Sequence, residues 1–203
     1  MLGYLNLPNL ITALGVLLAL NGCFAAWKGL FPAAMICLML AGLCDLFDGL
    51  VARKMELSPE EQAYGAQIDS LADVCLFGMA PVLMLLPLGS SWLEWIVYGF
   101  YLLAVLNRLA WFNLKGLAGE GEIQYYTGLP VTYMALILPL GMIVYFLLPE
   151  MLRMIWNLLL FGGTGSLFIS KLQIPKPRGK AYAFFPALAG VMIVLWSWHP
   201  WMP

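Results

Sequence analysis

Four aspartates lie within one short stretch of the 203-residue chain, DLFDGLVARKMELSPEEQAYGAQIDSLAD at 45–73. The first pair, Asp45 and Asp48, is separated by three positions. The second pair, Asp69 and Asp73, is separated by four positions. Residues at either spacing share one face of an α-helix, about 5 to 6 Å apart. The sequence therefore predicts two helices that each present a pair of carboxylates on one face.

These two pairs have the chemistry of a divalent-metal site. Two helices joined by a short loop pack antiparallel, so the two acidic faces can meet. Four carboxylates so close together repel each other and lose hydration, at a cost of several kcal/mol each. Hard cations with oxygen ligands neutralise such a cluster, and two cations can share bridging carboxylates. We therefore predict that two Mg²⁺ or Mn²⁺ ions are bound by Asp45, Asp48, Asp69 and Asp73.

Small residues accompany both pairs. Gly49 and Ala52 follow Asp45 by about one and two helical turns. Gly65 precedes Asp69 by one turn. These residues leave room either for a bulky ligand or for close packing of helices. An acidic pair on a single helix is more often a solvated surface feature, but here the pairs recur on neighbouring predicted helices within apolar sequence. We therefore interpret the stretch as a functional site.

The rest of the chain must position these carboxylates in a membrane. It is 63% hydrophobic and only 10% charged, whereas an average soluble domain has about 25% charged residues. Only helices satisfy their own backbone hydrogen bonds in lipid, and each span needs about 20 residues. We therefore predict an all-α integral membrane protein, a single domain over 1–203, built as a bundle of about six to seven transmembrane helices. The expected spans are Asn9–Trp27, Leu30–Arg53, Glu61–Leu86, Ser91–Asn113, Thr127–Leu148, Arg153–Ser170 and Ala181–Trp198, with GGTG at 162–165 breaking the sixth.

The ten basic residues predict the orientation of this bundle. Alternating spans place eight of them on the side of the aspartates and leave Lys28 and Arg153 on the other side. Because basic residues favour the cytoplasmic side, the aspartates are expected to face the cytoplasm. We predict a multi-pass protein of the cell membrane, either a plasma membrane or a bacterial inner membrane. The eight residues are Arg53, Lys54, Arg108, Lys115, Lys171, Lys176, Arg178 and Lys180.

The spacing of the acidic stretch matches a known signature. It reads Asp45-x2-Asp48-Gly49-x2-Ala52-Arg53-x11-Gly65-x3-Asp69-x3-Asp73, which resembles the signature of the CDP-alcohol phosphotransferase family. The gap between Arg53 and Gly65 is longer than the usual family spacing, so MELSPEEQ is expected to extend the turn between the two helices.

The resemblance implies an activity and a role for each residue. Members of the family are integral membrane enzymes that hold two metal ions and displace CMP from a CDP-linked lipid or alcohol. By position, Asp45, Asp48 and Asp69 would be metal ligands, and Asp73 would be both a ligand and the general base. The family also implies a homodimer, and no nucleic-acid partner is expected. The residues implied to bind the CDP group are Gly49, Ala52 and Gly65, which allow its approach, and Arg53, which holds a phosphate.

Five flanking motifs look like one branch of the family, the membrane-embedded phosphatidylserine synthases. In that branch the donor is CDP-diacylglycerol and the acceptor is L-serine, within a bilayer of membrane lipids. The chain departs from the branch at Trp111, where a second Arg is common. The motifs are PNLIT at 8–12, SLADVCLFGMAP at 70–81, RLAWFN at 108–113, YYTGLP at 125–130 and SKLQIPKP at 170–177.

Several assignments outside the signature have two open interpretations. Arg108 and Asn113 are candidates for binding the acceptor, because a zwitterion such as serine needs a cation for its carboxylate. Arg108 can equally be an interfacial anchor. Asn9 and Thr12 can face the nucleotide or cap the first helix.

The acceptor itself also has alternatives. Glycerol 3-phosphate, inositol phosphate or choline could accept the phosphatidyl group by the same chemistry. A phosphorylated acceptor would need a denser basic pocket, which favours serine. A different class of protein, a cation transporter, can also carry acidic residues within its spans. The basic segment at 171–180 is expected either to be attracted to anionic lipid headgroups or to bind a substrate.

Overall fold

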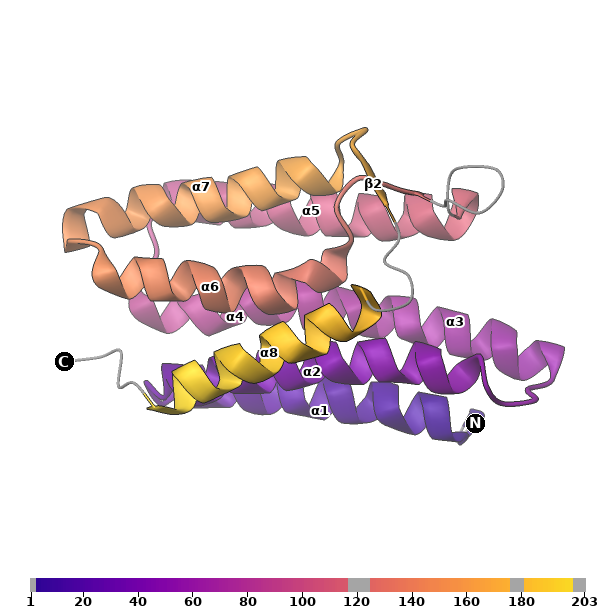
Figure 1. Ribbon diagram of the computed structural model, residues 1–203. Helices are drawn as coiled ribbons and strands as arrows, with labels where there is room; N and C mark the ends of the chain where they lie inside the picture. The colour runs from indigo at the N-terminus through magenta and orange to yellow at the C-terminus, as the bar shows by residue number, and fades with distance from the viewer. Residues whose placement is uncertain (1–2, 117–124, 176–180, 199–203) are drawn as a thin grey trace.

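The long helices of the protein run side by side along a common direction, as the computed structural model shows (Figure 1). The structure describes residues 3–116, 125–175 and 181–198. The helical segment Pro59–Leu88 is continuous, because α3 passes through a π-helical turn, η1 (Val74–Met79), into α4 and a 3₁₀ turn, η2 (Leu86–Leu88). The α-helices are α1 (Leu7–Trp27), α2 (Phe31–Ala52), α3 (Pro59–Asp73), α4 (Ala80–Leu85), α5 (Trp92–Lys115), α6 (Met134–Leu147), α7 (Glu150–Phe168) and α8 (Ala181–Trp198).

Four of these segments are long and apolar enough to cross a membrane, namely α1, α2, the 59–88 segment and α5. The segments Val131–Leu147 and Phe184–Trp198 are shorter apolar helices. Large apolar side chains such as Leu10, Leu14 and Leu17 are exposed along α1, as expected for a surface that faces lipid rather than water. The predicted all-α, multi-pass membrane fold is confirmed.

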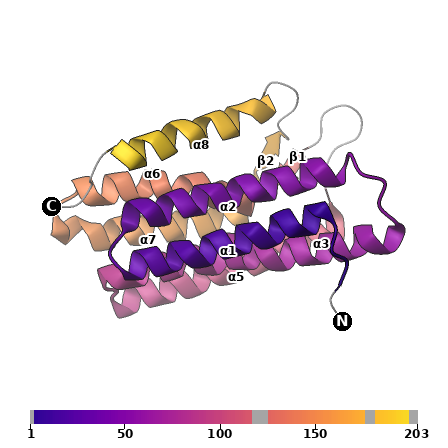
Figure 2. The ribbon, with the colours of Figure 1, turned by 90° about the horizontal axis from the view of Figure 1, so that it is seen from below.

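The two helices that carry the acidic stretch, α2 and α3, both pack against α1. The helix α2 lies centrally, in contact with α1, α6 and α8, while α5 pairs with α7 (Figures 1 and 2). The turn between α2 and α3 lies at the end of the bundle where α5 finishes and α8 begins. Lys28, which caps α1, and Arg153, in the first turn of α7, belong to the opposite end. Lys28 and Arg153 therefore lie at the end of the bundle away from the aspartates, as the alternation of spans predicted.

Two short strands form a sheet that the sequence did not predict. The strand β1 (Tyr125–Thr127) pairs antiparallel with β2 (Gln173–Pro175). Thr127, which was expected to begin a span, therefore belongs to β1, and the next helical turn, η3 (Val131–Tyr133), starts four residues later. The backbone turns at Gly128, where φ is +80° and an added Cβ would collide with the carbonyl oxygen of Phe168. Only glycine suits this position.

Two other expectations about element boundaries were wrong. The GGTG sequence at 162–165 does not break its helix, because α7 continues to Phe168. Gly165 instead lets α7 approach α5, since a Cβ there would lie 3.3 Å from the Cα of Tyr101. The turn after Arg53 is also shorter than expected. Ser58 and Glu61 form a capping box that starts α3 at Pro59, so the PEEQ part of MELSPEEQ is helical.

A side chain of α5 forms a hydrogen bond with the backbone of the π-helical turn that follows Asp73. Pro81 has no N–H, so the carbonyl oxygen of Phe77, four residues earlier, loses its usual helical donor. The hydroxyl of Tyr101, which is fully buried on α5, donates a hydrogen bond to that oxygen. An unpaired carbonyl would be costly in a lipid environment. Tyr101 therefore joins α5 to the segment that carries Asp69 and Asp73.

We predict that Tyr101→Phe lowers the stability of the protein by about 1 kcal/mol. The variant keeps the ring but removes the hydroxyl that donates to the carbonyl of Phe77. A thermal-unfolding measurement in detergent should show a lower midpoint than in the wild type. Tyr125→Phe, in the half-buried strand β1, is the matched removal of a hydroxyl and should leave the midpoint close to the wild-type value. Equal midpoints for Tyr101→Phe and the wild type would contradict the assigned role.

Candidate functional site

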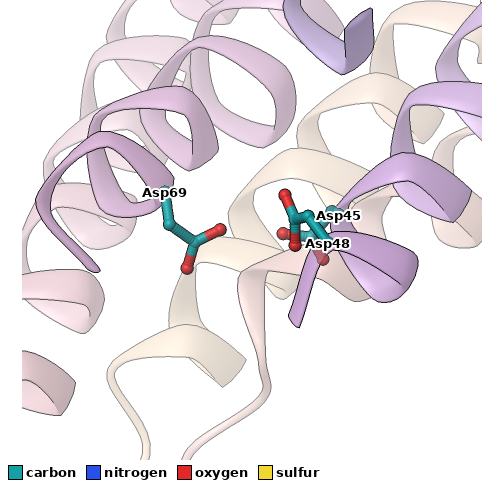
Figure 3. Close-up of side chains that lie close together, drawn as sticks. All are labelled: Asp45, Asp48 and Asp69. Atoms are coloured by element: carbon teal, nitrogen blue, oxygen red, sulfur yellow. The ribbon is translucent and has the colours of Figure 1, made fainter. Parts of the chain in front are cut away.

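Three carboxylates from two antiparallel helices meet at one point of the bundle. Asp45 and Asp48 lie on α2 and Asp69 lies on α3, and one ligand oxygen from each lies within 4.8 Å of the others. Figure 3 shows the carboxylate of Asp69 directed across the gap toward the other two. The predicted convergence of the two acidic faces is therefore present in the structure.

Asp73 adjoins this cluster one helical turn beyond Asp69. Its side chain is only 8% exposed, and its carboxyl group contacts that of Asp45. Its Oδ1 atom is buried and has no hydrogen-bond partner. A buried carboxylate oxygen without a partner is costly, which indicates that a ligand or cation completes the site.

The donor set of the cluster fits a hard divalent cation. The ligand atoms that converge are all carboxylate oxygens, which Mg²⁺ and Mn²⁺ prefer. Oxygens bound on opposite sides of a cation at about 2.0 to 2.6 Å lie at most about 5 Å apart. The 4.8 Å span of Asp45, Asp48 and Asp69 falls within that limit.

A cavity of about 440 Å³ opens beside the carboxylates between α1, α2 and α3. It contains all six residues for which the sequence predicted contact with the CDP group. Asp48 and Asp69 form one part of its wall. The six residues are Asn9, Thr12, Gly49, Ala52, Arg53 and Gly65.

The helix-capping alternative for Asn9 and Thr12 is wrong, because Asn6 is the N-cap of α1 and accepts from the backbone N–H of Asn9. The hydroxyl of Thr12 instead donates to Oδ2 of Asp48 at 2.5 Å. The side-chain amide of Asn9 donates to the backbone oxygen of Tyr4 at 2.8 Å. Both side chains are thereby fixed at the wall of the cavity.

The glycines of the signature are not tightly packed against their neighbours. A Cβ added at Gly49 would find its nearest neighbour at 3.6 Å, the side chain of Arg53, and one added at Gly65 would lie 3.4 Å from Asn9. These are ordinary contacts. By contrast, a Cβ at Gly42 would lie 2.5 Å from that of Ala135, as expected for a glycine required by packing. Of the two interpretations of the small residues, room for a ligand is the better supported for Gly49 and Gly65.

A second cavity, of about 300 Å³, adjoins the same carboxylates on the side of α5 and β1. All four aspartates contribute to its lining, together with Arg108 of α5, which comes from a distant part of the sequence. Tyr126 and Thr132 also line it. Sequence reasoning did not single out these two residues, although YYTGLP was noted as a motif. The carboxylates therefore border two cavities of different composition.

Arg108 is a buried residue of this second cavity. Its side chain is 6% exposed, which argues against the interfacial-anchor interpretation. Its Nε donates to the backbone oxygen of Leu129 at 3.1 Å, and its guanidinium carbon lies 5.5 Å from the centre of the Phe112 ring. Leu129 is itself held by α7, because its N–H donates to the carbonyl of Leu167. The turn at Gly128 thus helps to position Arg108.

Asn113, the other predicted acceptor residue, has a different environment. Its side-chain amide donates to Oγ of Ser70 at 2.9 Å, which links α5 to α3. Asn113 is not among the described residues that line either cavity.

The segment before α1 is held against α3 by two contacts of Tyr4. The hydroxyl of Tyr4 donates to Glu60 of α3 at 2.6 Å, and this hydrogen bond raises the pKa of the Tyr4 phenol. The rings of Tyr4 and Tyr64 pack edge to face. These contacts were not predicted, because the only signal was a pair of tyrosines far apart in the sequence.

Comparison with known proteins identifies related sequences. Residues 5–169 match the profile of the CDP-alcohol phosphatidyltransferase family. A CDP-diacylglycerol-serine O-phosphatidyltransferase from Mycobacterium bovis is 33% identical over 129 residues, which are 61% of this chain and 44% of that protein.

Two further relatives carry the same name. The protein from Saccharomyces cerevisiae is 33% identical over 160 residues, which are 68% of this chain and 57% of the relative. The protein from Methanocaldococcus jannaschii is 28% identical over 188 residues, which are 92% of this chain and 79% of the relative. The chain thus spans about half the length of the first two relatives.

Proposed function

Because the chain belongs to the CDP-alcohol phosphatidyltransferase family, as its signature predicted, we propose that it transfers a phosphatidyl group from CDP-diacylglycerol to L-serine and releases CMP. The observation that carries this proposal is the position of the four aspartates between two cavities. One cavity holds the residues predicted to bind the nucleotide, and the other holds Arg108. The names of the relatives support serine as the acceptor.

In this proposal Asp45, Asp48, Asp69 and Asp73 hold two Mg²⁺ or Mn²⁺ ions. When bound there, the ions supply positive charge that neutralises the diphosphate of the donor and stabilises the departing CMP. Thr12 keeps the carboxylate of Asp48 in place through its hydrogen bond. Such outer partners fix the direction in which a ligand oxygen points.

The first cavity is assigned to the donor. Asn9 and Thr12 face the nucleotide, while the absence of side chains at Gly49 and Gly65, with the small Ala52, allows the CDP group to approach α2 and α3. Arg53 lines both cavities and is placed to bind a phosphate oxygen. The donor lipid enters from the bilayer, so its acyl chains remain among membrane lipids.

The second cavity is assigned to the acceptor. Arg108 binds the carboxylate of serine, with its guanidinium held by Leu129 and Phe112. Asp73 takes the proton from the serine hydroxyl. The hydroxyl oxygen then forms a bond to the phosphorus that carries diacylglycerol, the bond from that phosphorus to the CMP oxygen breaks, and CMP leaves with the electron pair.

The remaining parts of the proposal concern location and assembly. The basic residues at the aspartate end support a cell-membrane protein with its site facing the cytoplasm. The homodimer implied by the family stays a prediction. The same chemistry with glycerol 3-phosphate, inositol phosphate or choline is the second candidate. A phosphorylated acceptor would need more cations than Arg53 and Arg108, which are the basic residues in the described lining of the second cavity.

We predict that Arg53→Lys and Arg108→Lys affect different substrates. Each variant keeps the positive charge and loses the planar, two-pronged hydrogen bonding of arginine. Losing one charged hydrogen bond, worth about 1.5 to 3 kcal/mol, raises a KM by about tenfold or more. Arg53→Lys should raise the KM for CDP-diacylglycerol, and Arg108→Lys the KM for serine. Initial rates with each substrate varied in turn provide the test, and a reversed pattern would exchange the two assigned cavities.

The proposed function is tested by acceptor-dependent release of CMP. Purified protein in detergent receives CDP-diacylglycerol, Mn²⁺ or Mg²⁺, and one of four acceptors: L-serine, glycerol 3-phosphate, inositol phosphate or choline. The expected result is CMP release with serine and background release with the others. Release with another acceptor alone would assign that substrate instead, and no release with any would contradict the transfer reaction.

A further inference from the structure

A third cavity, of about 350 Å³, lies behind Arg108 and away from the aspartates. It is formed where the last turns of α5 and α7 meet β1. None of the four aspartates lines it, and Arg108 is the residue that it shares with the second cavity. Its polar lining consists of Asn107, Arg108, Thr127, Ser170 and Lys171, with Trp111 at one side.

The charge of this cavity is entirely positive. Arg108 and Lys171 contribute two cations, and no aspartate or glutamate is found among the described residues of its lining. Arg108 is nine-tenths buried, and its hydrogen bond to Leu129 uses Nε, which leaves the two terminal nitrogens of the guanidinium for another acceptor. A third cation, Lys115, lies 5.9 Å from the Trp111 ring. A lysine beside a buried arginine, with no acidic residue among the described lining residues, favours an anionic ligand.

The surroundings of the cavity are apolar and outward-facing. Trp111 is 52% exposed and Ile169 is 51% exposed, and both belong to its lining. Leu114 and Leu172, close by in sequence, are more exposed still. In a multi-pass membrane protein such side chains contact lipid, and tryptophan favours the level of the headgroups. The cavity therefore opens at the rim of the lipid-facing surface, at the end of the bundle with most of the basic residues.

We propose that this cavity binds the phosphate group of an anionic phospholipid, with the acyl chains lying along the exposed apolar surface of α5 and α7. Lys171 binds the phosphate oxygens, and Asn107 and Thr127 are placed to hydrogen-bond the headgroup. Arg108, which this cavity shares with the second one, adds positive charge to the wall between them. Basic pockets between helices at a membrane surface bind anionic headgroups in this way. Inorganic phosphate shares the same chemistry without the chains.

The test measures lipid binding by native mass spectrometry of the full-length protein in neutral detergent, titrated with phosphatidylglycerol or phosphatidylcholine. The wild type is expected to bind phosphatidylglycerol more tightly. Lys171→Glu should weaken that binding at least about fivefold, which is the change in affinity expected when one cation near an anionic headgroup is lost. Lys54→Glu is the matched control, because Lys54 is an exposed lysine at the same end of the bundle and outside the cavity, and it should bind as the wild type does.

A second arm separates the two sources of phosphate. Inorganic phosphate is titrated by calorimetry into the lipid-free protein, with the same variants. If phosphate binds and Lys171→Glu abolishes its binding while phosphatidylglycerol binds all variants equally, free phosphate is the occupant and the anion site stands. If Lys171→Glu changes the affinity for neither ligand, the proposal is overturned. Neither arm requires turnover, so failure here is distinct from failure of the proposed reaction.

Discussion

Asp73→Asn is expected to reduce CMP release by more than about a hundredfold, beyond the loss seen when an outer partner of a metal ligand is changed. The change removes the charge of a buried carboxyl group that contacts Asp45 and carries an unpartnered oxygen. It also removes the proposed base, so the loss should appear in kcat rather than in either KM. Steady-state rates with serine and CDP-diacylglycerol measure both quantities.

Glu94→Gln is the matched control for this prediction. Glu94 is also a buried acid, 5% exposed, but it lies in the first turn of α5, at the opposite end of the bundle from the aspartates. It accepts hydrogen bonds from Ser91 and Asn157. Its replacement should change stability more than rate per folded molecule. If Asp73→Asn is folded, elutes from a size-exclusion column as the wild type does and has a kcat similar to that of the wild type, Asp73 is not the base.

Removal of divalent metal is expected to have the second large effect, a complete and reversible loss of CMP release. With a chelator, the four carboxylates have no cation to offset their repulsion, and the diphosphate of the donor has no counter-charge. Adding Mg²⁺ or Mn²⁺ in excess should restore the rate. Full activity after exhaustive chelation would show that the cluster does not act through a metal.

Metal binding can also be measured without turnover. A ligand present at 100 times its Kd stabilises a folded protein by about 2.7 kcal/mol. Mn²⁺ should therefore raise the unfolding midpoint of the wild type, and Asp69→Asn should lose most of that increase. Glu94→Gln provides the comparison for a destabilised protein with an intact cluster. An equal increase in Asp69→Asn and the wild type would exclude Asp69 as a ligand.

The acidic site was predictable because its geometry is local. The spacing of Asp45, Asp48 and Asp69 within two helices, together with a short connecting turn, is sufficient to bring the carboxylates together. The residues implied by the family signature, Gly49 and Arg53 among them, lie on the same two helices and line the first cavity for the same reason. Thr12 was predicted to face the nucleotide, whereas its hydrogen bond to Asp48 was not predicted and arises because α1 packs directly against α2.

The rest of the site depends on contacts between distant segments. Pairing of β1 with β2 joins residues about 50 positions apart, and three-residue strands carry no periodic signal of their own. Tyr126 and Thr132 reach the second cavity only because of that pairing and the turn at Gly128. The continuity of α7 through GGTG was likewise decided by close packing on α5, which overrides the low helix propensity of glycine.

The most direct test of the account follows the acceptor into the product. Isotope-labelled L-serine is incubated with the purified protein, CDP-diacylglycerol and Mn²⁺, and the lipids are extracted and analysed by mass spectrometry. The account predicts labelled phosphatidylserine in an amount equal to the CMP released, and neither product with Asp73→Asn. Release of CMP without label in the lipid would contradict transfer to serine.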